Sequence, residues 1–222
     1  MYFGLSAGLQ LLDVASFSLT LHRNEFTRCS SVIVGFGGNA YGGGVSIYIG
    51  GYNSSLSFAG SASASVGDTT VRNASVSVDW ANFTSCSASS TAEKGSNAYG
   101  GSFALYVGAY AWSFSNDSSR NSSSSSSSAS GLTSASGVNV SISHVNSFDC
   151  SAVSTGEFYK FGANSYGGSI SVAYIGAYAW SFAAGSSSSS SSVCGASNVT
   201  GLMISISSST FNDSSAASRT LQ

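Results

Sequence analysis

The sequence predicts an all-β fold, a parallel β-helix (a solenoid) of about three and a half repeat units, each 57 to 64 residues long. Three observations predict it. Motifs recur residue by residue at this period, apolar residues alternate with polar ones as in half-buried strands, and no long helical periodicity is present. A β-sandwich is the main alternative, but it does not require such repetition.

The repeat is clearest around a Tyr-Gly-Gly element. Residues 97–114 return at 164–182, and a looser copy occupies residues 39–52. A second motif, an alternating strand followed by Phe-Thr-x-Cys or a variant of it, precedes each copy and also closes the chain. These motifs define one solenoid domain over residues 1–222, with units at about 16–72, 73–136, 137–197 and 198–222.

Each unit contains two alternating strands. In the first, Ala74, Val76 and Val78 alternate with polar residues; the second follows the Gly-Gly pair, with Phe103 and Leu105 on one face. Corresponding apolar sets in the other units are Phe17, Leu19, Leu21; Val138, Val140, Ile142; and Leu202, Ile204, Ile206.

Two serine homopolymers interrupt this pattern, at residues 122–128 and 186–192. They follow the Trp-Ser-Phe segment of consecutive units and carry no apolar residue to bury. We therefore expect them to be Ser-rich loops inserted into the repeating scaffold. Both ends of the sequence cut through a repeat, so we also expect the chain to be a fragment of a longer array whose open solenoid ends favour self-association.

Charge and composition exclude several function classes. Seven Lys and Arg against nine Asp and Glu give a net charge of −2, and the chain has 58 serines and no proline. No basic stripe exists to neutralise phosphates, so we expect no nucleic-acid binding. The apolar residues of 167–185 alternate rather than run continuously, so we expect no membrane insertion.

The motifs resemble the GGAI and FxxN repeats of the chlamydial polymorphic outer-membrane protein family. The segments 42–45, 100–103 and 167–170 resemble GGAI, and 26–29, 83–86 and 211–214 resemble FxxN with Cys or Ser replacing Asn; 148–150 is one residue short. The resemblance implies a right-handed parallel β-helix of the pectin-lyase type in a secreted or surface-displayed adhesive protein.

Three of the four cysteines follow the Phe motif. Stacked units would place Cys29, Cys86 and Cys150 in one structural column, with neighbours about 4.8 Å apart. That separation lies within disulfide range, but parallel Cβ vectors suit the bond poorly. No Cys or Cys/His spacing indicates zinc. We expect inert buried thiols, no metal site and no cofactor.

The two histidines allow two registers. Aligned on the Phe motif, His22, Asp79 and His144 form a column that could bind a metal ion. Aligned on the strands and cysteines, His144 lies instead beside Trp80, and His22 beside Asp79 and Ser143. The second register keeps the apolar alternation intact, so we favour it. In this register the three residues do not form a metal-binding column. The nine carboxylates are scattered with no adjacent pair, so we predict no catalytic residue and no enzyme, although acids from different coils could still converge.

Aromatic residues form the best binding candidate. The face opposite Phe103 and Leu105 carries an aromatic series that two units repeat. Stacked in register, it would form ladders along the solenoid axis. Exposed, these could stack on sugar rings or self-associate; buried, they are core packing. The candidate ligand-stacking residues are Tyr106, Tyr110, Trp112, Tyr174, Tyr178 and Trp180.

Taken together, these features predict a non-enzymatic, repetitive extracellular or cell-surface protein with a structural or adhesive role. Its expected partners are carbohydrate or other cell-surface proteins. The alternative is a β-helix protein that binds or degrades polysaccharide through the aromatic strand. Eight Asn-x-Ser/Thr sequons and the serine tracts would carry glycans if the protein is eukaryotic and secreted.

Overall fold

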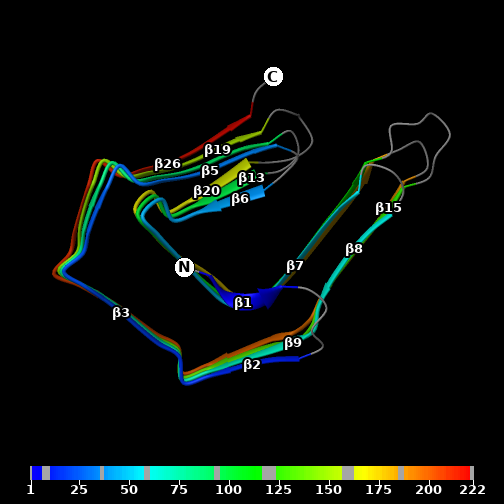
Figure 1. Cartoon of the computed structure of the whole chain (residues 1–222), viewed down its shortest axis with the longest axis horizontal. Coiled ribbons are helices and arrows are strands. Elements are labelled where there is room, and N and C mark those ends of the chain that lie inside the picture. Colours follow the sequence, from blue (N-terminus) through cyan, green and yellow to red (C-terminus); the bar gives the residue numbers. More distant parts are fainter. Residues whose placement is uncertain are drawn as a thin grey trace.

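A computed structural model describes residues 2–6, 11–35, 38–57, 61–92, 96–116, 124–156, 163–184 and 188–220. Every regular element in these ranges is a β-strand, and all strand pairs are parallel. Equivalent strands of successive repeats lie one behind another when the stack is viewed end on (Figure 1). The predicted all-β, parallel stacked fold is confirmed.

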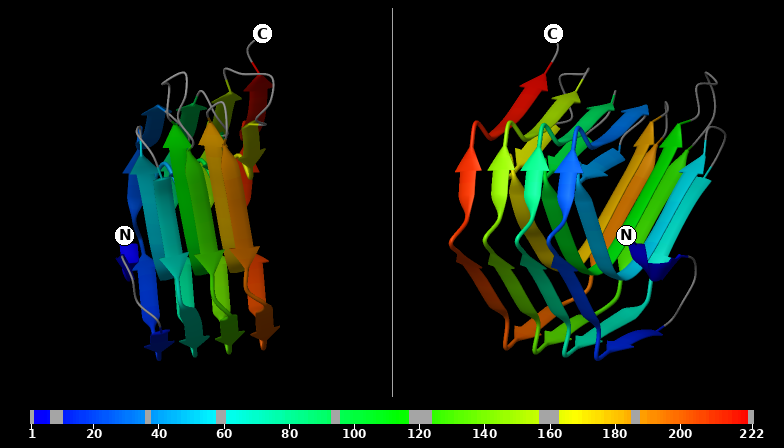
Figure 2. Two further views of the ribbon diagram at one scale, coloured as in Figure 1. Left: turned by 90° about the vertical axis from the view of Figure 1, so that its right-hand side faces the viewer. Right: turned by 60° about the vertical axis from the view of Figure 1, so that its left-hand side comes forward.

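The described strands form seven sheets that run along the stack, and each sheet contains equivalent strands of successive coils (Figures 1 and 2). The segments whose alternation is clearest in the sequence form the central sheet of the outer wall, and a further sheet continues the wall on either side. The central sheet contains β3 (Ser18–His22), β10 (Ser75–Asp79), β17 (Asn139–Ser143) and β24 (Met203–Ser207); its neighbours contain β2 (Leu11–Ala15), β9 (Asp68–Arg72), β16 (Thr133–Ser136), β23 (Ser197–Thr200), and β4 (Glu25–Thr27), β11 (Asn82–Thr84), β18 (Asn146–Phe148), β25 (Thr210–Asn212).

The other four sheets complete each coil. One closes the wall, a second lies beneath it, a third crosses the interior, and a fourth lies on the outside of the crossing strands (Figure 1). In that order they contain β5 (Ser30–Gly35), β12 (Ser87–Ala92), β19 (Ser151–Gly156), β26 (Ser215–Thr220); β6 (Gly38–Tyr41), β13 (Ser96–Tyr99), β20 (Ala163–Tyr166); β1 (Tyr2–Ser6), β7 (Val45–Ser57), β14 (Phe103–Asn116), β21 (Ile170–Ala184); and β8 (Ser61–Val66), β15 (Ser125–Ser130), β22 (Ser189–Cys194).

The main core lies between the outer wall and the first half of the crossing strands. Val76 and Val78 of β10 and Phe83 of β11 point inward and meet Phe103 and Leu105 of β14; all five are 2% exposed or less. Their polar neighbours in β10 face outward, as the sequence alternation predicts. Apolar burial against the next coil is the main stabilising term of the stack.

The corners between wall strands are made by single residues in the left-handed region. Trp80 (φ 55°) separates β10 from β11, and His144 (φ 51°) separates β17 from β18. The corner N–H groups bond to the next coil, as in Trp80 N–H to the Ser143 carbonyl at 3.1 Å. One left-handed residue per corner therefore turns the chain without breaking the ladder.

The Tyr-Gly-Gly element is the tight turn into the crossing strand. Gly100 has φ +55°, and a Cβ there would overlap the Phe103 carbonyl oxygen. A Cβ on Gly101 would overlap backbone atoms of Gly168 and Ser151 in the next coil. Left-handed conformation at the first position and close backbone approach at the second therefore both require glycine.

The crossing strand bends sharply near its middle, where Gly108 has φ +140°, and separates two environments. Its first half descends into the interior and its second half rises again beside β8 and β15, so that β7, β14 and β21 together form a V (Figure 1). The odd-numbered residues, from Phe103 to Ala111, pack on the convex side of the V. The even-numbered aromatic residues, including Tyr106 and Tyr110, line its concave side.

The serine tracts are strands in their described parts, which corrects the prediction of inserted loops. In β15 the side chains alternate strictly between exposed and buried. The buried hydroxyls of Ser126 and Ser128 hydrogen-bond to Ser113 Oγ of β14 at 2.7 and 2.8 Å. Backbone pairing with both neighbouring strands and the hydrogen-bonded inward hydroxyls of Ser126 and Ser128 replace the missing apolar burial. Residues 122, 123, 186 and 187 lie outside the described ranges.

Candidate functional site

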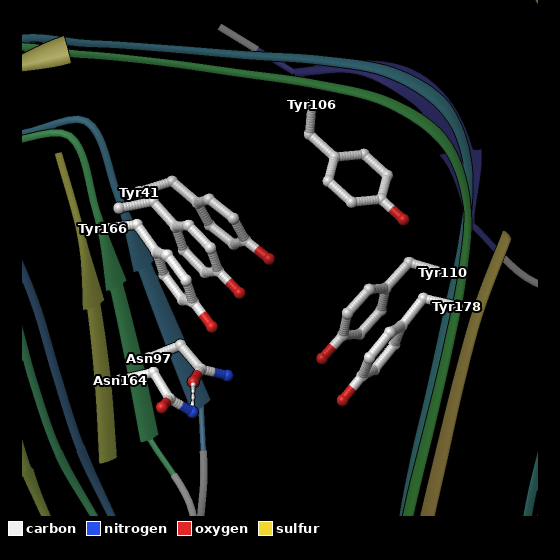
Figure 3. Close-up of a pocket in the computed structure, with 8 residues that line it drawn as sticks. Tyr41, Asn97, Tyr106, Tyr110, Asn164, Tyr166 and Tyr178 are labelled. Atoms are coloured by element: carbon white, nitrogen blue, oxygen red, sulfur yellow. Dashed lines mark hydrogen bonds between the residues drawn. The ribbon is translucent and has the colours of Figure 1, made fainter. Parts of the chain in front are cut away.

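A groove lined by tyrosine and asparagine runs along the concave side of the V. One wall is formed by β6, β13 and β20, and the other by the crossing strands (Figure 3). The tyrosine hydroxyls of the two walls point towards each other across the gap. We call this the tyrosine groove; its tyrosines are Tyr41, Tyr99 and Tyr166 on the first wall, Tyr52, Tyr110 and Tyr178 on the second, and Tyr48 and Tyr106 on the floor between them.

The groove contains two cavities, each of about 380 Å³. Tyr41 and Tyr106 line both. No charged side chain lines either cavity among the described residues. The remaining lining residues are Asn97, Tyr99, Tyr110, Asn164, Tyr166 and Tyr178 in the first cavity, and Ser31, Asn39, Ser46, Ile47, Tyr48 and Tyr52 in the second.

The tyrosine rings of each wall stack face to face. On the first wall the ring centroids of Tyr41 and Tyr99 are 4.9 Å apart, and those of Tyr99 and Tyr166 are 5.0 Å apart. On the second wall Tyr110 stacks on Tyr52 at 5.5 Å and on Tyr178 at 4.9 Å. Interplanar angles of 7–12° follow from the in-register pairing, which repeats one ring orientation in every coil.

Two further tyrosines form the floor. Tyr48 and Tyr106 are stacked with centroids 4.6 Å apart and are 8% and 5% exposed. Their hydroxyls donate to backbone carbonyls just past the bend, Tyr48 to Gly51 at 2.7 Å and Tyr106 to Ala109 at 3.2 Å. The floor rings therefore support the V-shaped bend of the crossing strands.

An asparagine ladder runs beside the tyrosines of the first wall. Asn164 Nδ2 donates to Asn97 Oδ1 at 3.1 Å, and Asn97 Nδ2 donates to Asn39 Oδ1 at 2.8 Å. Asn39 Nδ2 in turn donates to the hydroxyls of Tyr41 at 3.1 Å and Tyr110 at 2.7 Å. This last contact links the two walls of the groove.

Burial keeps two groove phenols protonated. The pKa of Tyr41 and that of Tyr110 are raised well above 10.0, chiefly because burial penalises the phenolate, and neighbouring tyrosines add to the shift. A hydrogen bond with Asn39 acts in the opposite direction on both. The two hydroxyls are therefore neutral groups that can donate as well as accept hydrogen bonds.

The structure brings together part of the aromatic set predicted from the sequence. Tyr106, Tyr110 and Tyr178 line the groove, while Trp112 and Trp180 stack on each other at 5.8 Å further along the second wall. The side chain of Tyr174 lies outside the described residues. The opposite wall was missed because its Asn and Tyr residues stand next to the Gly-Gly turn, where the sequence gives no sign of what they face.

The His–Asp set follows the register aligned on strands and cysteines. Asp79 pairs with His22 and Ser143, and Trp80 stacks on the ring of His144 at 4.3 Å. The Asp79 carboxylate lies 3.2 Å from His22 Nδ1 and 3.1 Å from His144 Nδ1. Across the part of the chain that the structure describes, no cluster of three or more His, Cys, Asp or Glu could hold a metal ion.

The cysteines of the Phe motif stand at equivalent positions, and all four thiols are free. Cys86 and Cys150 are fully buried, and Cys86 N–H donates to Cys150 Sγ at 3.4 Å. Burial raises the pKa of the Cys86 thiol to about 12, so this thiol is neutral at physiological pH and a poor nucleophile. Cys194 is exposed.

Comparison of the chain with protein-family models, with curated protein sequences and with solved structures finds no match. The fold and the groove define a stacked parallel β-strand protein whose groove is lined, among the described residues, by tyrosine, asparagine and other uncharged side chains. Among the described residues, no helix is long and apolar enough to cross a membrane.

Proposed function

We propose that this chain belongs to a non-enzymatic, repetitive protein of the cell surface or extracellular space, with a structural and adhesive role. The observation that carries the proposal is the hydroxyl-rich outward face that β8 and β15 form on a regularly stacked scaffold. The outward side chains of β8 and β15 are serine at every position except Ala129, and Ser61 and Ser125 hydrogen-bond between coils at 2.7 Å.

The resemblance to polymorphic outer-membrane protein repeats supports the same proposal. GGAI-like and FxxN-like elements stand at the turn into the crossing strand and at the corner after β4, β11 and β25. Both are positions where the coil needs a special backbone conformation. A pectin-lyase-type β-helix on a cell surface would likewise place its GGAI and FxxN elements at the turns and corners of each coil. Stacked repeats supply a long, stiff surface from short units, which suits attachment between a cell and its surroundings.

Surface labelling tests the proposal. Antibodies raised against the purified chain should bind intact cells of the source organism, and external protease should remove the signal. Beads coated with the chain should adhere to those cells or to their extracted matrix. Labelling only after permeabilisation would overturn the proposal, whatever the chain binds.

The second candidate function is carbohydrate binding, and the tyrosine groove favours it. Protein sites for sugars combine aromatic rings with hydroxyl and amide groups, and both are present along the two walls. An adhesive protein that recognises a glycan through this groove would unite both candidates.

A further inference from the structure

We propose that the tyrosine groove binds a single chain of neutral polysaccharide running parallel to the stack, through tyrosine hydroxyls and asparagine amides rather than through ring faces. This inference rests on the proposed function, because it names the ligand class by which such a surface would adhere. Its evidence is independent of where the protein resides.

The faces of the inner tyrosine rings are closed to a ligand. Tyr99 is covered on both faces by Tyr41 and Tyr166, and Tyr110 by Tyr52 and Tyr178, at centroid distances of 4.9–5.5 Å. A sugar ring stacked on a tyrosine would lie about as far from it as the neighbouring tyrosine already does. No space therefore remains for a sugar between two stacked tyrosine rings. The ladders therefore offer the groove only their edges and hydroxyls (Figure 3).

Those edges form two facing rows of neutral hydrogen-bonding groups. A phenol hydroxyl donates and accepts, and an asparagine amide has two donor hydrogens and one acceptor oxygen. Sugar hydroxyls also donate and accept, so they match groups of either kind. Because the phenols of Tyr41 and Tyr110 remain protonated, they keep their donor hydrogens at alkaline pH as well.

The lining fixes the charge of the ligand. Among the described residues, neither cavity is lined by a cationic or anionic side chain. A uronate or sulfate group would lose its hydration without gaining an ion pair, which is costly in a partly buried site. A neutral chain avoids that cost.

The spacing fits a polymer. Equivalent tyrosines repeat at the distance between neighbouring strands, about 4.8 Å. A pyranose unit in an extended chain has a similar length, so successive sugars would meet equivalent groups in successive coils. Between the two cavities the chain must replace the Asn39–Tyr110 hydrogen bond with sugar hydroxyls. A polymer that spans both cavities would therefore bind better than a disaccharide.

Tyr-to-Phe variants separate hydroxyl recognition from ring stacking. Tyr166→Phe combined with Tyr110→Phe keeps both ring stacks and removes two hydroxyls. We expect this variant to bind neutral polysaccharide about 10-fold more weakly, since about one net hydrogen bond is lost. Most of the loss should come from Tyr166, because the Tyr110 hydroxyl already bonds to Asn39 in the free protein. Ser127→Ala, on the outward face of β15, is the matched control and should bind like the wild type.

Affinity electrophoresis of the whole chain measures the effect, with hydroxyethylcellulose, galactomannan and xyloglucan as neutral probes and polygalacturonate and alginate as anionic ones. Thermal unfolding of each variant checks that the fold is intact. Retardation by a neutral probe that the double Phe variant weakens supports the inference. No retardation by any neutral probe, preference for an anionic probe, or unchanged binding by a folded double Phe variant would each overturn it. Surface labelling of cells is unaffected by all these outcomes, so a failure here is distinct from a failure of the proposed function.

Discussion

Asp79 is the residue whose charge the coils control most directly. Its carboxylate accepts a hydrogen bond from Ser143 Oγ at 2.7 Å and lies between the rings of His22 and His144. The pKa of Asp79 is lowered from its ordinary value of 3.8, chiefly by the Ser143 hydrogen bond. Desolvation is the next largest effect and opposes the shift, and His144 and His22 lower the pKa further. The neighbouring coils thus favour the ionised carboxylate.

This shift predicts a contribution of Asp79 to stability at mildly acidic pH. Because the folded-state pKa lies below the unfolded one, the contribution is present above about pH 4 and is lost as the pH falls through the folded value. Asp79→Asn should therefore flatten the fall in unfolding free energy between about pH 5 and about pH 2, measured by urea titration. Ser143→Ala, which removes the largest cause, should give part of the same flattening. Parallel curves for wild type and Asp79→Asn would contradict this account.

At the scale of the element, the crossing strands depend on a column of glycines at the bend. A Cβ on Gly108 would overlap backbone atoms of Gly176 in the next coil, and Gly50 stands in the same relation to Gly108. Only backbone without a side chain allows the strands to stack through this point.

Gly108→Ala should therefore destabilise the chain by about 3 kcal/mol or more, because the backbones of two coils must separate. Gly137→Ala is the matched control. That glycine is also left-handed, at φ +61°, but an added Cβ there meets the side-chain oxygen of Asn73 first. Its cost should be about 1 kcal/mol. Chemical denaturation measures both, and equal costs would show that the stacking contact at the bend is not what requires glycine.

The serine strand makes a second prediction at this scale. Ser126 is buried against β14, whereas Ser127 is exposed. Ser126→Asp buries a charge and should cost about 3 kcal/mol or more, whereas Ser127→Asp should change stability by less than about 0.5 kcal/mol. If both substitutions are tolerated in denaturation experiments, the tract is not an inward-outward alternating strand.

The elements also show how far sequence reasoning reaches. The alternation of β10 and β17 predicted their strands and inward faces, because apolar and polar residues differ along them. The strand conformation of β15 could not be predicted in this way, since serine occupies both of its faces. The segment is ordered by hydrogen bonds to Ser113 of β14. Nothing in the sequence distinguishes Ser113 from the other serines as the partner of this tract.

At the scale of the whole molecule, the repeated motifs of the sequence predicted the length of each coil and the register in which the coils pair. They did not predict the path that the chain follows around one coil. The inward crossing of β7 and β14 has no separate sequence signal beyond a glycine at the bend. The tyrosine groove exists only because that crossing brings β14 opposite β13. The sequence therefore predicted the aromatic ladder that forms one wall. It did not predict that this ladder faces a second wall across a groove.

Parallel, in-register stacking of the coils places every ladder and both walls of the tyrosine groove. Spin labels on Cys variants of Ser63 and Ser127, with Cys29 and Cys194 replaced by Ser, test this most directly. These two exposed serines lie on adjacent strands with their hydroxyl oxygens 3.2 Å apart. Stacking predicts label sites about 5 Å apart and an electron paramagnetic resonance spectrum strongly broadened by spin–spin interaction. A spectrum equal to the sum of the two singly labelled proteins would contradict the stacked fold and, with it, the groove.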